Sequence, residues 1–282
     1  MAVDKLVDST KLDASLAYTA DRIRAKTGES ADILFDLSNE KGFGDAIDAI
    51  PTGGGGEWTT EGIAAGTEPS GDITVTGSTI AASAFAGKPI TSIRGDNVTN
   101  IGNNAFLNCQ SLGNASFPNL VSVTGTYIFQ QCRSAFVAHF PKLTTTPNNS
   151  YMFYNAGTSS SYKGIVVMPA ATSLGSRTFD RCYLDKVDIG PGITALNTDM
   201  FYNNIDTKTV NVLILRYAGG VVTTSNTDRI KGLRDVYVPQ ALVTQYEQAS
   251  NWSTRVAAGK LTFHAIEGSA YENAYADGTP IT

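Results

Sequence analysis

The chain has 282 residues, a formal net charge of −5, 42% hydrophobic residues and 17% charged residues. This length and hydrophobic content suffice for one large domain or two. Binding to nucleic acid is not expected, because the sequence has no basic run that would neutralise phosphates. Membrane insertion is not expected either, because no apolar run approaches the roughly 20 residues that span a bilayer. The N-terminus lacks the charged-then-apolar pattern of a secretory signal, so we expect a protein made in the cytoplasm.

Residues 1–50 have a helical pattern. Apolar or small residues recur at spacings of 4, 3 and 4 at Leu12, Leu16, Thr19 and Ile23, and a second helical pattern spans residues 42–50. Isolated helices of this length are marginally stable in water. They either pack against each other as a hairpin or associate with other chains, so the segment is predicted to be a helical attachment or oligomerisation module.

Residues 51–57 contain four consecutive glycines and are predicted to be a flexible linker. A phosphate-binding loop is the competing interpretation. That loop needs a lysine and a hydroxyl side chain after the glycines, whereas Glu57 and Trp58 follow here. The linker interpretation is therefore preferred.

A short phrase then occurs six times, in forms such as AFLNC, IFQQC and TFDRC. Its phenylalanines follow one another at spacings of 21, 23, 24, 26 and 22 residues, at Phe85, Phe106, Phe129, Phe153, Phe179 and Phe201. Repetition with a period of about 20–30 residues is typical of stacked-repeat solenoids. We predict a β-rich solenoid of about six repeats over residues 58–240.

Each repeat also contains an apolar phrase that ends in proline, such as LGNASFP at Pro118 and AFVAHFP at Pro141. Alternation of apolar and polar residues predicts a short strand, which the proline ends. When the phrases are aligned on their prolines, alternate residues of each strand face outward. The predicted ligand-binding face consists of the outward residues Arg94, Asn114, Ser116, Val137, His139, Ile165, Val167, Lys186, Asp188, Ile214, Asp235 and Tyr237.

Several outward positions are apolar, namely Val137, Ile165, Val167, Val212 and Ile214. A contiguous exposed apolar patch usually indicates an interface. Two other interpretations stay open. Branched residues simply favour strands, or the register is shifted by one residue and these side chains face inward.

The stretch IGNNAFLNCQSLGNASFP at Ile101–Pro118 combines the phenylalanine and proline phrases in register. It resembles the bacterial leucine-rich repeat of the BspA-like (Treponema-type) class, in which Ile-Gly, Ala-Phe, Cys, Leu and Pro recur in this order. The resemblance covers about residues 73–240 and is weaker at 143–165. It implies a leucine-rich-repeat solenoid, curved, with a ladder of short parallel strands along one face.

Residues 241–282 are predicted to form a C-terminal cap and tail. Leu242, Val243, Tyr246 and Ala249 lie at helical spacing, and Trp252 follows. Because the last coil of a solenoid exposes an apolar face, a helical cap is expected at this end.

Three cysteines, Cys109, Cys132 and Cys182, each follow a repeat phenylalanine by three residues, and Ala156 and Asn204 occupy the same position in other repeats. A position that accepts Cys, Ala and Asn is a small, partly buried site rather than a disulfide or a metal ligand.

Catalytic motifs are lacking. His139 lies on a predicted strand surface, and the sequence has neither G-x-S-x-G nor H-E-x-x-H. We therefore expect no catalytic residues, no metal site, no cofactor and no enzymatic activity. An enzyme on a solenoid scaffold stays an alternative, which clustered acids and aromatics in one groove would favour.

The opening text KLVDSTKLDASLAYTADRIRAKTGES looks like the start of tail-associated leucine-rich-repeat proteins of Gram-positive phages and prophages. This resemblance implies a receptor-binding protein of a virion tail or prophage-derived particle, which binds a bacterial surface protein or glycan through its repeats. Residues 1–50 would contact other tail proteins or form a homo-oligomer. The alternative is a cell-surface adhesin that binds a host protein or glycan, for which a signal peptide and an anchor are expected.

Overall fold

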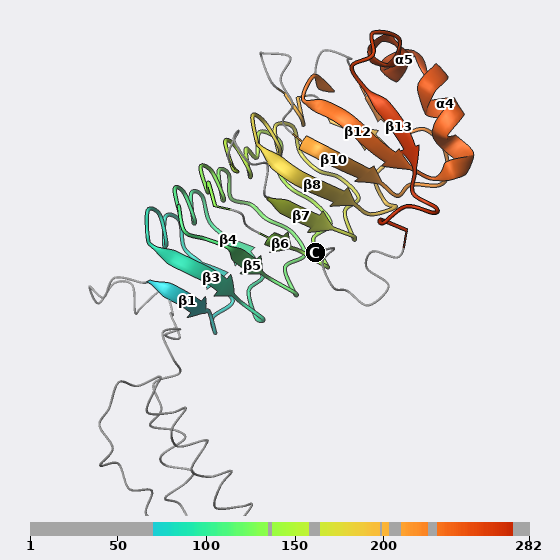
Figure 1. Cartoon of the computed structure of the whole chain (residues 1–282). Coiled ribbons are helices and arrows are strands. Elements are labelled where there is room, and N and C mark those ends of the chain that lie inside the picture. The colour runs from blue at the N-terminus through green and yellow to red at the C-terminus, as the bar shows by residue number, and fades with distance from the viewer. Residues whose placement is uncertain are drawn as a thin grey trace, which may run out of the picture. The chain divides into compact units, whose positions relative to one another are not determined.

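The computed structural model describes residues 70–134, 137–157, 164–197, 199–202, 210–224 and 230–272. All of them belong to one of the two compact units of the chain, Glu57–Thr282. The predictions for residues 1–50 and 51–57 lie outside the described residues. The described part winds into a β-solenoid of about eight turns, here called coils (Figure 1).

One face of the solenoid is a sheet of nine strands, all paired in parallel (Figure 1). The strands, in their order across the sheet, are β1 (Gly71–Thr74), β3 (Ile90–Arg94), β5 (Asn114–Ser116), β6 (Val137–His139), β7 (Ile165–Met168), β8 (Leu184–Ile189), β10 (Val210–Leu215), β12 (Leu233–Val238) and β13 (Thr262–Ala265). Each coil contributes one strand, so the sheet order follows the chain order. The predicted ladder of short parallel strands is confirmed.

A second, interrupted ladder runs where each coil turns back. It contains the parallel pairs β2 (Thr79–Ile80) with β4 (Asn100–Ile101) and β9 (Ala195–Leu196) with β11 (Thr223–Thr224). Isolated bridges join Thr145 to residues of the coils on either side. The coils are thus hydrogen-bonded to one another on more than one side.

The six repeat phenylalanines form one column inside the solenoid. Consecutive rings lie 5.0–5.5 Å apart between centroids, with planes within 5–11° of each other. The backbone N–H of each of the first five donates to the carbonyl that precedes the next phenylalanine, at 2.8–3.0 Å. Ring stacking and backbone hydrogen bonds therefore repeat with the same period, and every ring is buried.

A left-handed residue precedes each phenylalanine by two positions, and another follows each of the first five by two positions. The residues before are Ser83, Asn104, Tyr127, Tyr151, Arg177 and Asp199, and the described residues after are Gly87, Asn108, Gln131, Asn155 and Arg181, with φ between 44° and 72°. The sharp turns at these positions direct the phenylalanine inward and its flanking side chains outward. We call the two sets the front slots and the back slots.

The cysteines are buried and unpaired in disulfides. The thiols of Cys109 and Cys132 donate to the carbonyl oxygens of Phe85 and Phe106 on the preceding coils, at 3.0 and 3.1 Å. Burial raises the pKa of Cys182 well above its ordinary value.

The C-terminal part contains a 3-10 turn (Gln240–Leu242) and two short helices, α4 (Val243–Gln248) and α5 (Ser250–Ala257). The Trp252 indole donates to the carbonyl of Val222 at 2.9 Å, and the Tyr246 hydroxyl accepts from the N–H of the same residue. The chain then continues into β13, which adds a strand to the main sheet (Figure 1). A helical cap at the end of the solenoid is therefore not confirmed.

Candidate functional site

The residues predicted to face outward lie in two rows across the nine-stranded sheet. One row contains Asn114, Val137, Ile165, Lys186 and Asp235, and the other contains Arg94, Ser116, His139, Val167, Asp188, Ile214 and Tyr237. The residues between the two rows, one on each strand from Ile73 on β1 to Phe263 on β13, are buried on the inner side of the sheet. The register obtained from the prolines is thus confirmed, and the interpretation with a one-residue shift is wrong.

Only the N-terminal half of these rows is open. Arg94 and Asn114 are exposed, and Ser116, Val137, His139 and Ile165 are half-buried. Burial also lowers the pKa of His139, which favours the neutral imidazole at neutral pH.

The C-terminal half is largely covered, so this part of the predicted ligand-binding face is not open. Val167 and Ile214 are fully buried, while Lys186 and Asp188 are 7% and 1% exposed. Arg216 binds the Asp188 carboxylate through two hydrogen bonds of 2.9 and 2.7 Å and donates to the Tyr271 carbonyl. The segment after β13 thus folds back over the sheet, and the Tyr271 ring lies 5.2 Å from the Lys186 ammonium.

Asp235 and Tyr237 are half-buried and already have partners. The His264 ring contacts the Asp235 carboxylate at 2.9 Å and stacks on Tyr237, whose ring also meets Tyr271 edge to face. These contacts fix the C-terminal end of the sheet. The Asp235 side chain is nevertheless 40% exposed.

The predicted apolar patch is not an exposed surface. Val137, Ile165 and Val212 are half-buried, and the other two members are buried. Among the described residues, Val121, which is 51% exposed, is the sole large hydrophobic side chain that is well exposed. The described surface therefore lacks an apolar patch of the kind that protein interfaces use.

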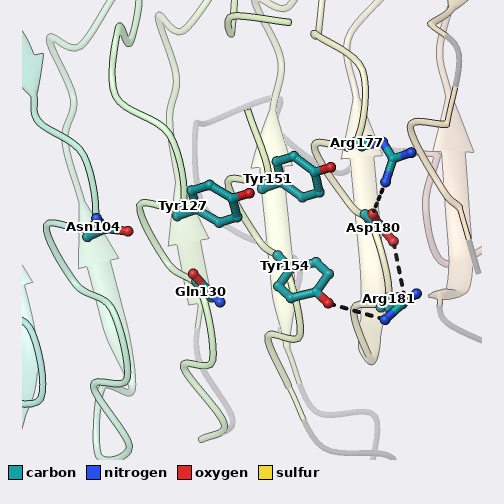
Figure 2. A pocket seen from close by; sticks show the side chains of 8 residues that line it. All are labelled: Asn104, Tyr127, Gln130, Tyr151, Tyr154, Arg177, Asp180 and Arg181. Carbon is teal, nitrogen blue, oxygen red and sulfur yellow. Dashed lines mark hydrogen bonds and ion pairs between the residues drawn. The ribbon is translucent and has the colours of Figure 1, made fainter. Parts of the chain in front are cut away.

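A groove of about 480 Å³ lies instead beside the phenylalanine turns (Figure 2). Its lining comes from the front slots, the back slots and the residue that follows each phenylalanine, and consists of Asn104, Tyr127, Gln130, Tyr151, Tyr154, Arg177, Asp180 and Arg181. We call it the tyrosine groove. Because the same positions recur on each coil, residues far apart in sequence form one row of side chains.

The front slots of the groove form a stack. The Tyr127 and Tyr151 rings are 4.7 Å apart and nearly parallel, and Tyr154 meets both edge to face. The Arg177 guanidinium lies 5.4 Å from the Tyr151 ring and 5.5 Å from the Tyr202 ring, within the range of cation–π contacts. The groove thus has a rigid aromatic wall.

Ion pairs form the other end of the groove (Figure 2). Arg177 donates to Asp180 at 3.2 Å and to Asp199 at 3.3 Å, and Arg181 donates to the Tyr154 hydroxyl at 3.3 Å. Asp180 is only 1% exposed, and its Oδ1 lies 3.9 Å from the Arg181 Nε without a hydrogen bond. Burial raises the pKa of Asp180 to about 6, against the opposing effect of the two arginines.

The large residues in the front slots cost conformational energy. Left-handed backbone costs roughly 1–2 kcal/mol for ordinary residues and little for Asn or Asp. Asn104 and Asp199 show that such residues fit these slots, yet Tyr127, Tyr151 and Arg177 occupy the three between them. Side chains retained at a backbone cost are candidates for function.

The tyrosine groove is not among the sites predicted from the sequence, because the repeated phrase was interpreted as a core pattern alone. The signal was present in the alignment of the phrases, where Tyr, Tyr and Arg replace Asn at equivalent positions. Recognising it requires knowing that the slots beside the phenylalanine point outward.

Other kinds of site find no support in the described part of the chain. Its residues include no group of three or more His, Cys, Asp or Glu side chains that could hold a metal ion. None of its helices has the length and apolar content needed to cross a membrane.

Residues 78–208 match the family model of the BspA type leucine rich repeat region in six copies. The chain therefore contains a BspA-type leucine-rich repeat region, as the resemblance of Ile101–Pro118 indicated. No curated protein matches the chain at a significant level. Repeats of this type favour a protein-interaction or adhesin-like role.

Proposed function

We propose that the chain is a non-enzymatic recognition protein of a phage tail or prophage-derived particle, which binds a component of the bacterial surface. The tyrosine groove is the observation that carries the recognition role. It is an ordered, ligand-sized cleft built from equivalent positions of four successive coils, in a repeat region that favours an adhesin-like role.

The particle context is supported by the resemblance of the N-terminal text to tail-associated proteins. On this proposal, residues 1–50 attach the chain to other tail proteins or join copies of it, and the protein is located in the virion. Recognition requires no cofactor and no contact with nucleic acid. The groove has a fixed wall of stacked rings, so little conformational freedom is lost when a ligand binds.

A cell-surface adhesin that binds host protein or glycan is the alternative. The BspA-type repeat region supports an adhesin-like role and is compatible with either context. The two differ in the partner, since a tail protein binds bacteria and an adhesin binds host tissue.

Hydrolysis is a second candidate function, because the groove combines aromatic rings with a carboxyl group of raised pKa. The geometry favours recognition instead. Asp180 and Asp199 bind the same guanidinium, and Asp180 is almost fully buried. General acid–base catalysis needs a carboxyl group within hydrogen-bond reach of the substrate.

Binding of the labelled full-length chain to intact Gram-positive bacteria and to animal cells tests the proposal. Saturable binding to bacteria, reduced by a Tyr127→Asn and Tyr151→Asn double substitution, is expected. Binding to animal cells alone would favour the adhesin. Failure to bind either cell type would refute recognition of a cell surface.

Attachment through residues 1–50 is tested by the solution mass of the full-length chain and of a chain that begins at Glu57. An oligomer that becomes a monomer on truncation supports an assembly role for the N-terminal segment. A truncated chain that still oligomerises would assign the contact to the solenoid instead.

A further inference from the structure

We propose that the tyrosine groove binds a neutral oligosaccharide, with one pyranose ring stacked on the open face of Tyr127 beside Asn104. This inference rests on the proposed recognition function, and adds the position of the site and the chemical class of the ligand. Figure 2 shows the row that carries it, from Asn104 through Tyr127 to Tyr151.

One face of the Tyr127 ring is open. Tyr151 on the following coil covers the opposite face at 4.7 Å, and Tyr154 contacts the ring at 89°. On the preceding coil the same slot holds Asn104, whose side chain is shorter than a tyrosine and leaves the ring uncovered (Figure 2). A flat ligand at this step would extend the row of stacked rings by one layer.

Polar groups surround the open face of the Tyr127 ring. The side-chain amides of Asn104 and Gln130 line the groove, and both residues are half-buried, so their polar atoms can reach a ligand there. Each amide offers two donors and one acceptor.

These groups match the surface of a sugar. A pyranose ring has an apolar face of C–H groups, which suits the negative face of an aromatic ring. Its hydroxyl groups both donate and accept at the rim, where the side-chain amides of Asn104 and Gln130 can pair with them. Because the groove extends over several coils, it suits a chain of sugar units rather than a single one.

The charges favour a neutral ligand over an anionic one. The arginines and aspartates of the cluster balance, and Arg177 already binds two carboxylates. Arg181 is engaged by the Tyr154 hydroxyl and lies beside Asp180. An anionic sugar would have to displace one of these contacts.

The groove is less suited to a peptide. Its lining contains no aliphatic side chain, whereas peptide anchors usually enter apolar pockets. The rings present hydroxyl groups and one open face rather than an enclosed pocket. A protein ligand is therefore an outcome of the test rather than a second proposal.

The test measures binding of the full-length chain to an array of neutral and anionic oligosaccharides, with affinities of bound sugars determined by calorimetry. The neutral set contains oligomers of glucose, galactose and N-acetylglucosamine, and the anionic set contains sialylated and uronic acid oligomers. We expect neutral oligomers to bind. Tyr127→Asn should weaken their binding at least tenfold, since the open aromatic face is lost, and Gln130→Ala at least threefold.

Matched controls exist in the back slots. Gln131→Asn places the same residue as Tyr127→Asn at a left-handed position, on the other side of Phe129, and outside the groove lining. Asn104→Gly and Asn108→Gly form a second pair, with φ of 57° and 61°. The two control variants outside the groove lining, Gln131→Asn and Asn108→Gly, should bind within twofold of the parent chain. The glycine pair keeps the test valid if Tyr127→Asn does not fold.

The outcomes separate this inference from the proposed function. Loss of bacterial binding after periodate oxidation of the cells, together with array binding that depends on Tyr127, supports both. Bacterial binding that survives periodate and is lost after protease treatment would overturn the saccharide inference and leave recognition in place. An array on which no neutral oligosaccharide binds, or on which Tyr127→Asn and Gln131→Asn bind alike, would also overturn it. Release of new reducing ends during incubation would replace recognition with hydrolysis.

Discussion

Acidification should stabilise the chain through Asp180. Its ordinary pKa is 3.8, which represents the unfolded chain, and burial raises it to about 6 in the folded state. Between these values the folded state binds more protons than the unfolded one, so the free energy of unfolding falls as pH rises from about 4 to 6. Each pKa unit corresponds to about 1.4 kcal/mol, so two units contribute up to about 3 kcal/mol.

The assay is urea denaturation of the parent chain and of Asp180→Asn at several pH values between 4 and 7. Other carboxyl groups titrate in both proteins, so their effects largely cancel in the difference. On going from pH 7 to pH 4, the parent should gain about 1–3 kcal/mol relative to Asp180→Asn. A constant difference, or a relative loss by the parent, would refute the reasoning and show that the ion pairs outweigh burial. Coincident circular dichroism and fluorescence transitions are required, since solenoids do not always unfold in two states.

Three further predictions concern the fold. Phe129→Leu should lower the free energy of unfolding, measured by urea denaturation, by about 1–3 kcal/mol, and Phe85→Leu should lower it by about half as much. The reason is that Phe129 stacks on two repeat rings and Phe85 on one. Equal losses would count against the stacking column. Gly175→Ala should cost about 1–3 kcal/mol, because its Cβ would overlap a proline carbonyl on the preceding coil, whereas Gly77→Ala meets no atom within 4 Å. A thermal melt compares the two, and similar midpoints would contradict the overlap. Tyr271→Ala should increase acylation of the buried lysine in β8 several-fold in mass spectrometry, and unchanged labelling would show that other groups bury it.

The ladder was predictable because side-chain alternation and proline position are local properties. Aligning the prolines placed Asn114 beside Val137 and Ile165 beside Lys186, which are the pairs in the sheet. The column of phenylalanines was likewise predictable, since a residue repeated at the solenoid period must lie above its equivalents.

Exposure on that face was not predictable from the same pattern. Lys186 lies at an outward position, as predicted, but is covered by Tyr271, which is far along the chain. Neither periodicity nor spacing relates a strand to a tail that crosses it. The tyrosine groove was missed for a different reason. Tyr127 is one residue among many around a phrase, and its importance depends on the left-handed turn that turns it outward.

The slots beside each phenylalanine make the recognition surface modular. The backbone hydrogen bonds and the ring column depend on the phrase itself, whereas the front slot accepts Ser, Asn, Tyr, Arg or Asp. Duplication or loss of a whole coil would preserve the packing and lengthen or shorten the row of side chains by one unit. Such a surface can change its ligand through substitutions in single slots and its span through the number of coils, with the interior held constant.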